Sequence, residues 1–153
     1  MHTYTEPGSY TVTLQAYNAD GYNSSRKVGY ITVTRPAMAG VFRNSTHKFY
    51  LDKTGDGVWN TGDTLYTFGN TGDLPITGDW NHDGITEIGV FRNSTHKFYL
   101  DKTGNGIWNT GDVLYTFGNT GDTPITGDWN HDGITEIGVF RPSTHKFYLD
   151  KTG

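Results

Sequence analysis

Apolar and polar residues alternate with a period of two in the first part of the chain. The alternation runs through residues 9–17 and again through residues 29–33, and residues 18–21 between them are turn-forming types. A period of two places successive side chains on opposite faces of a β-strand. Asn, Asp and Gly favour tight turns. The pattern therefore predicts two antiparallel strands joined by a turn.

Short runs of β-forming residues continue through the rest of the chain. One set of four lies at residues 88–92, 96–100, 113–117 and 124–127, and Gly, Asn, Asp and Thr clusters separate them. No segment has the spacing of three to four residues, or the end caps, that a helix requires. The sequence therefore predicts an all-β fold.

A repeat organises these strands. The run Gly-Val-Phe-Arg begins at Gly40, Gly89 and Gly138, 49 residues apart. A period of about 40–50 residues with four short strands is typical of a propeller blade or a β-solenoid unit. We expect tandem four-stranded, propeller-blade-like repeats in an open array. The predicted divisions are a first segment at residues 1–34, a linker at 35–39, complete copies at 40–88 and 89–137, and a truncated copy at 138–153.

Composition narrows the classes of partner. Only 33% of the residues are hydrophobic and 21 are Gly, so 10 Tyr, 8 Phe and 4 Trp must supply much of the core. The net charge of −4 offers no basic stripe for nucleic acid or for an anionic membrane surface. Cysteine is absent, which excludes disulfides and thiol metal sites, and no apolar run is long enough for membrane insertion.

One loop carries the pattern of a calcium site. The segment Gly-Asp-Trp-Asn-His-Asp-Gly-Ile-Thr-Glu begins at Gly78 and returns unchanged at Gly127. It places oxygen-bearing side chains at loop positions 1, 3, 5 and 9, a backbone carbonyl at 7 and Gly at 6, which suits the six to eight oxygen ligands of Ca²⁺. Such residues also form plain turns, but three converging negative charges favour a cation. The predicted ligands are Asp79, Asn81, Asp83, Ile85 and Glu87, and Asp128, Asn130, Asp132, Ile134 and Glu136.

A second loop has a weaker form of this pattern. It again has oxygens at alternate positions and Gly at position 6, but its last residue is Asp where such loops usually have Glu. A plain turn between two strands is the alternative reading. The candidate ligands are Asp52, Thr54, Asp56, Val58, Asn60 and Asp63 in the first copy, and Asp101, Thr103, Asn105, Ile107, Asn109 and Asp112 in the second.

These motifs resemble known families. Residues 40–153 resemble the FG-GAP or VCBS-type repeats of cell-surface proteins, whose Asp-x-Asp/Asn-x-Asp-Gly-x-x-Asp/Glu loops bind calcium. Residues 2–14 and 30–33 resemble the C-terminal part of a PKD-type domain, an immunoglobulin-like β-sandwich. The resemblance implies an extracellular or cell-surface location and places calcium ligands on the side chains of the first loop. The sequence departs from the pattern at His82 and His131, which occupy a slot often filled by a small residue.

Catalysis finds little support in the sequence. There is no Gly-x-Ser-x-Gly elbow and no phosphate loop, and the carboxylates belong to the calcium-type loops. His47, His96 and His145 are interpreted as turn residues, and the Trp residues as packing. We therefore expect a protein without enzymatic activity that binds calcium and has a structural, adhesive or self-assembling role. An accessory polysaccharide-binding module that uses exposed Trp or Tyr is the alternative.

The number of copies suggests assembly. Little more than two periods fit into residues 40–153, too few to close a ring of about 4–8 blades. We expect self-association through open β edges, as a ring that closes or a filament that does not. The partial sandwich at the N-terminus would borrow a surface from the repeats or from another copy of the chain.

Overall fold

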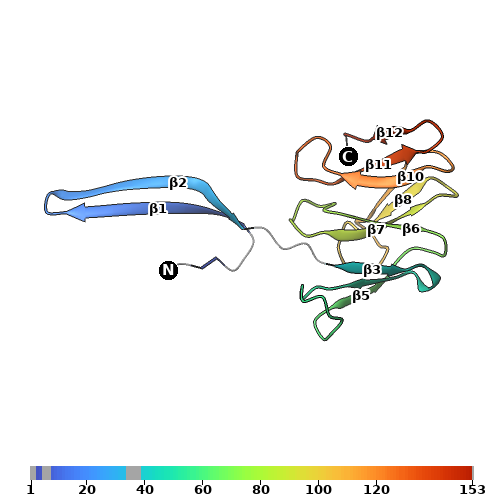
Figure 1. Cartoon of the computed structure of the whole chain (residues 1–153), viewed down its shortest axis with the longest axis horizontal. Helices are drawn as coiled ribbons and strands as arrows, with labels where there is room; N and C mark the ends of the chain where they lie inside the picture. The colour runs from blue at the N-terminus through green and yellow to red at the C-terminus, as the bar shows by residue number, and fades with distance from the viewer. Residues whose placement is uncertain (1–2, 5–7, 34–38, 153) are drawn as a thin grey trace. The chain divides into compact units, whose positions relative to one another are not determined.

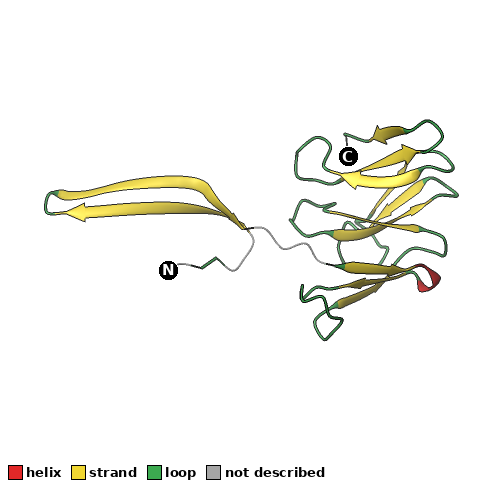
Figure 2. Cartoon of the chain, in the orientation of Figure 1, coloured by secondary structure: helices red, strands yellow, loops and turns green. Residues whose placement is uncertain are grey.

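The computed structural model describes residues 3–4, 8–33 and 39–152. It divides into two units, with the boundary after residue 37, and most of the predicted linker lies outside the described residues. Among the described residues, every regular element is a β-strand apart from a single turn of 3₁₀ helix, η1 (Asn44–Thr46), as Figure 2 shows. The prediction of an all-β fold is confirmed.

The first unit contains a hairpin of β1 (Gly8–Asn18) and β2 (Gly21–Val33). The strands pair in antiparallel register (Figure 1). The side-chain oxygen of Asn18 accepts a hydrogen bond from the backbone N–H of Asp20 at 3.0 Å, which supports the predicted turn. β2 begins eight residues before the predicted start at Gly29, because the mostly polar residues 21–27 continue the ladder with β1 although they lack the alternation.

The hairpin exposes most of its large apolar side chains. In particular, Tyr17 is 72% exposed and Val28 is 76% exposed. A two-stranded hairpin is marginally stable by itself in water, so this unit is short of buried apolar surface within its own described residues. Tyr4 contributes some cover, since its ring lies 4.5 Å from that of Tyr10 between centroids.

The second unit contains three antiparallel sheets (Figure 1). Sheet I has the order β3-β4-β5, sheet II the order β6-β7-β8-β9, and sheet III the order β10-β11-β12. The strands are β3 (Gly40–Arg43), β4 (Lys48–Leu51), β5 (Thr64–Thr67), β6 (Leu74–Gly78), β7 (Glu87–Arg92), β8 (Lys97–Leu100), β9 (Val113–Thr116), β10 (Thr123–Gly127), β11 (Glu136–Arg141) and β12 (Lys146–Leu149).

The strand bounds agree with the four predicted segments to within one residue, but the sheets are offset from the sequence copies. Sheet II takes β6 and the first two residues of β7 from residues 40–88, and the rest of β7, β8 and β9 from residues 89–137. Ile76 of one copy thus lies opposite Gly89 of the next. β10 joins β11 and β12 in sheet III in the same way. Each junction between copies is therefore secured by a ladder of backbone hydrogen bonds.

The core lies between neighbouring sheets. Phe91 and Phe98 of sheet II are 0% exposed, with ring centroids 4.6 Å apart, and they share a cluster with Ile137 and Val139 of sheet III. A second cluster joins Phe49 of sheet I, and Phe68 just after it, to Ile88 and Val90 of sheet II. Aromatic side chains bury a large area each. Neighbouring sheets therefore share their cores, and none of the three has a separate one.

Candidate metal centre

The loop between β6 and β7 is folded around the carboxylate of Asp79. Its Oδ1 accepts hydrogen bonds from the backbone N–H groups of His82 (2.6 Å) and Asp83 (3.2 Å), and its Oδ2 accepts one from Gly84 (2.8 Å). Gly84 has a φ of 79°, in the left-handed region that glycine occupies without steric cost. Local sequence therefore determines the course of this loop, as the spacing of Asp and Gly predicts.

The loop brings three carboxylates together. Asp79, Asp83 and Glu87 each place an oxygen within 4.8 Å of the others. The next copy repeats the cluster. Oxygen atoms from three carboxylates at this separation are the donors that Ca²⁺ or another hard cation takes. The second cluster consists of Asp128, Asp132 and Glu136.

The glutamate of each cluster is buried. Glu87 is 5% exposed, and its Oε2 accepts a hydrogen bond from the backbone N–H of Trp80 at 2.9 Å. Glu136 is 2% exposed and is bonded in the same way to Trp129 at 2.6 Å. Its Oε1 is buried and has no hydrogen-bond partner among the described residues. A buried carboxylate oxygen without a partner is costly, and a cation at the cluster would satisfy it.

The charge of Glu87 is poorly compensated by the protein. The pKa of Glu87 is raised to about 7, mainly by burial; the negative charges of Asp83, Asp79 and Asp101 also raise it, while the hydrogen bond from Trp80 lowers it. Desolvation and like charges both disfavour the ionised form. A bound divalent cation would reverse this preference.

The other predicted ligands of the first loop have mixed positions. The Oδ1 of Asn81 accepts a hydrogen bond from Asp83 N–H at 2.9 Å, and its amide nitrogen lies 3.3 Å from Asp83 Oδ2. Asn130 and Asp132 make the same two contacts at 2.9 and 3.0 Å. Each Asn thus lies beside the carboxylate cluster, and its side-chain oxygen already accepts a hydrogen bond from a backbone N–H. The carbonyl ligands at Ile85 and Ile134 stay a prediction.

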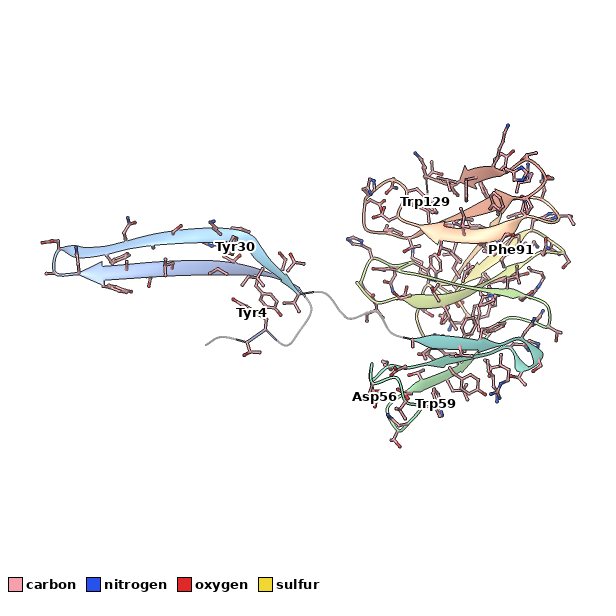
Figure 3. The ribbon with its side chains drawn as sticks, viewed as in Figure 1. Tyr4, Tyr30, Asp56, Trp59, Phe91 and Trp129 are labelled. Atoms are coloured by element: carbon pink, nitrogen blue, oxygen red, sulfur yellow. The ribbon has the colours of Figure 1, made fainter. Side chains whose placement is uncertain are left out.

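The second loop uses its carboxylates differently. Asp52 accepts hydrogen bonds from the backbone N–H groups of Gly55 and Gly57, each at 2.7 Å, and Asp63 accepts one from Asn60 at 2.7 Å. Among the described residues, the acids of this loop do not form a cluster of three like those of the first loop. Figure 3 labels Asp56 in this loop. Metal binding by the second loop, in either copy, stays a prediction.

The first loop of one copy, at residues 79–87, lies against the second loop of the next copy, at residues 101–112. The amide nitrogen of Asn81 donates to the carbonyl of Lys102 at 3.2 Å. A Cβ atom at Gly104 would lie 3.4 Å from the Cγ of Glu87. Asp101 is 0% exposed, and its Oδ2 accepts the N–H of Gly106 at 2.6 Å. The buried acid of the second loop thus adds negative potential beside the first loop.

Contacts between copies hold the first loop in place. Asp79 N–H donates to the hydroxyl of Thr135 at 3.0 Å, and the carbonyl of Asp79 accepts from Thr135 N–H at 2.8 Å. A cavity of about 120 Å³ lies beside the second cluster, and its lining includes Asp132, Glu136 and Trp80. It is roomy enough for water. The sequence interpretation missed Thr135, although it recurs in both copies of the motif.

The His and Trp residues divide by environment. The Nε2 atoms of His47 and His96 lie 2.7 and 2.9 Å from threonine hydroxyls, as expected of turn residues. Trp80 is 3% exposed and packs in the core, whereas Trp59 and Trp108 are 54% and 46% exposed. Figure 3 shows Trp59 in its loop. The packing interpretation is therefore confirmed for Trp80. Trp108 and Trp59 pack against Tyr99 and Tyr50, with ring centroids 5.3 and 5.2 Å apart, but about half of each side chain stays exposed.

Comparisons with known proteins add no assignment. Protein-family models, curated proteins and solved structures each gave no match to this chain. Among the residues that the structure describes, no helix is long and apolar enough to cross a membrane. The functional argument therefore depends on the site itself.

Proposed function

We propose that the loops at residues 79–87 and 128–136 bind Ca²⁺, and that this binding stabilises a repeat protein with a structural or adhesive role outside the cell. The convergence of three carboxylates in each of two copies carries the proposal. The donors are oxygen atoms only, without thiol or imidazole in either cluster, which favours a hard cation. Calcium accepts irregular geometry and many ligands, whereas magnesium requires a near-ideal octahedron.

Calcium would act by neutralising charges that the fold has already gathered. It would bind the folded loop and not the dispersed ligands of the unfolded chain, so it would raise stability by mass action. Asp79 is bonded to Thr135 of the next copy. Occupation of the first site would therefore also brace the junction between sheets II and III.

The test is a calcium titration of the full chain by calorimetry, together with thermal melting in calcium and in excess chelator. We expect two sites and a rise in melting temperature, and expect Asp83→Asn or Asp132→Asn to remove one site each. Asp20→Asn, in the hairpin turn of the other unit and outside every candidate loop, is the control and should leave the number of sites unchanged. No calcium heat and no change in melting temperature would refute the proposal, while equal stabilisation by magnesium would refute its specificity.

The finer architecture and the assembly belong to the same proposal. Antiparallel sheets that recur with the 49-residue period favour propeller-blade-like repeats of the FG-GAP or VCBS type in an open array. The exposed hairpin is compatible with the last two strands of a PKD-like sandwich. Strands at sheet edges offer unpaired backbone groups, which supports self-association as a ring or filament. Light scattering with and without calcium tests this: a monomer under both conditions would contradict it.

Polysaccharide binding is the second candidate function. Trp59 and Trp108 stand one period apart and are half exposed, beside Val58 and Ile107, which are 61% and 66% exposed. Exposed aromatic faces are suited to stacking on sugar rings. Replacing both Trp59 and Trp108 by Ala should then abolish a change in tryptophan fluorescence on addition of soluble cell-surface polysaccharides, with Tyr17→Ala as the control. An unchanged spectrum across such polysaccharides would remove this candidate.

A further inference from the structure

Sheet I differs from its two counterparts at one edge. β7 and β11 lie between two strands, because β6 and β10 pair with them on one side and β8 and β12 on the other. β3 has the same Gly-Val-Phe-Arg sequence, but among the described strands it pairs only with β4. The backbone groups along one edge of β3 therefore have no strand partner among the described residues. The equivalent groups of β7 and β11 are paired with β6 and β10.

The side chain of Val41 shows the same difference. Val90 and Val139 are 0% exposed at the equivalent positions, whereas Val41 is 66% exposed. The cover over the two buried valines comes from the segment just before β6 or β10. A Cβ atom at Gly69 would lie 2.9 Å from Val90, and one at Gly118 would lie 3.0 Å from Val139. A glycine backbone therefore packs directly on each buried valine.

The arginine at the end of β7 and of β11 binds an aspartate from the neighbouring segment. The same charge is therefore expected in a segment that would cover β3. Arg92 donates two hydrogen bonds to Asp73, at 2.9 and 2.8 Å, and Arg141 donates two to Asp122 at the same distances. Both aspartates are nearly buried, at 2% and 3% exposure. Paired bonds of this kind give both strength and geometric specificity.

Arg43 stacks on a tyrosine ring as Arg92 and Arg141 do, but it has no aspartate partner among the described residues. Its guanidinium lies over the ring of Tyr50 at 4.8 Å, as Arg92 and Arg141 lie over their tyrosines at 4.5 and 4.3 Å. No carboxylate among the described residues forms an ion pair with it. The guanidinium is therefore already held in position by the ring for an acidic partner.

We propose that the free edge of β3 is an acceptor site for one extended strand of a partner polypeptide with the sequence Phe-Gly-Asn-Thr-Gly-Asp-x-Pro-Ile-Thr-Gly. This is the sequence of residues 68–78 and 117–127, which cover β7 and β11. The partner strand pairs in antiparallel register, its first glycine, equivalent to Gly69 and Gly118, covers Val41, and its aspartate binds Arg43.

The chemistry of the edge favours this occupant over a generic strand. The backbone ladder alone would accept many extended segments. Arg43 selects a carboxylate at one position, and Val41 selects a segment without a side chain above it. Proline is tolerated because the incoming strand is itself an edge strand, as β6 is with Pro75 opposite Val90. The inference rests on the proposed assembly role but does not require bound calcium.

The test uses a fluorescent peptide with the sequence of residues 117–127, titrated with the full chain and followed by polarisation. We expect saturable binding. Arg43→Gln in the chain, or Asp122→Asn in the peptide, should each weaken it about tenfold or more, because each removes a charge-assisted pair. The two changes together should weaken it no further than one alone. Arg26→Gln, an exposed arginine in β2, is the matched control and should have no effect.

The outcomes separate this inference from calcium binding. The titration is run in calcium and in chelator, with the fold checked by circular dichroism. If the chain binds the peptide but its melting temperature does not change with calcium, the acceptor edge of β3 is supported and only the calcium-binding proposal is refuted. Absence of saturable binding by a folded chain in both conditions overturns the inference. Binding that is insensitive to Arg43 and to the peptide aspartate overturns it as well, as does a self-associated chain that the peptide fails to dissociate.

Discussion

Replacing Glu87 by Gln should change stability in opposite directions with and without calcium. Without a cation, Glu87 is a buried carboxylate beside three other acids, with its pKa raised to about 7. Gln cannot ionise, and its carbonyl can still accept the hydrogen bond from Trp80 N–H. Glu87→Gln should therefore stabilise the chain in chelator at pH 8. In calcium it removes a ligand and should destabilise the chain.

The magnitude follows from the linkage between protonation and folding. The pKa of Glu87 is raised from 4.5 to about 7 on folding, so its stability contribution is full below pH 4.5 and is lost as pH rises through about 7. Each unit is worth about 1.4 kcal/mol. Stability in chelator should therefore fall by roughly 2–3 kcal/mol between pH 5 and pH 8. Glu87→Gln should recover roughly 1–3 kcal/mol of this stability at pH 8. The gain can be smaller than the loss because the amide of Gln buries a hydrogen-bond donor that the carboxylate lacks.

The assay is urea denaturation followed by circular dichroism, at pH 5 and pH 8, in chelator and in calcium. Asp20→Asn, in the hairpin turn, removes one negative charge from the other unit and serves as the control. It should show no reversal of sign between the two conditions. Destabilisation by Glu87→Gln in chelator at pH 8 as well as in calcium would refute the reasoning, because the carboxylate would then be compensated by the protein alone.

Three further predictions compare equivalent positions or a single ion pair. Gly89→Ala should lower the free energy of unfolding by about 1–3 kcal/mol, because its Cβ would lie 2.9 Å from a backbone oxygen of the adjacent strand. At Gly40 the corresponding distance is 3.6 Å, so Gly40→Ala should lower it by less in urea denaturation. Val90→Ala should lower stability by roughly 2 kcal/mol and Val41→Ala by less than about 0.5 kcal/mol in the same assay, since only Val90 is buried; equal losses would contradict the fold. The hydrogen bond from its arginine partner lowers the pKa of Asp122 below 3.8, so its contribution is present above pH 3.8 and lost as pH falls through the lower value in the folded state; Asp122→Asn should flatten this acid limb in chelator.

Patterns confined to neighbouring residues could be read from the sequence. Strand positions follow from alternation and from turn residues, so the strands of the repeats were predicted to within one residue. The fold of the first candidate metal loop was predictable for the same reason: the carboxylate of Asp79 accepts hydrogen bonds from amides only three to five residues away. The early start of β2 was not predictable, because its polar residues become a strand only by pairing with β1.

Equivalent residues of the repeats have different environments, which the repeated sequence does not show. The sequence showed two identical copies of the loop, but not that Thr135 of one copy holds Asp79 of the other, 56 residues away. It also gave no sign that Trp80 would be buried and Trp59 exposed. Such contacts join segments that are distant along the chain, so local propensities cannot specify them.

The sequence by itself determined the strands, the repeat period and the loop that gathers its acids. The tertiary structure decided which copy supplies each strand, which acids are buried, and which strand edge is left open. Val41 and Val90 occupy the same tetrapeptide, yet one is 66% exposed and the other 0%. Identical residues share identical local preferences, whereas burial depends on the neighbours that pack on them, and only the folded arrangement provides or withholds those neighbours.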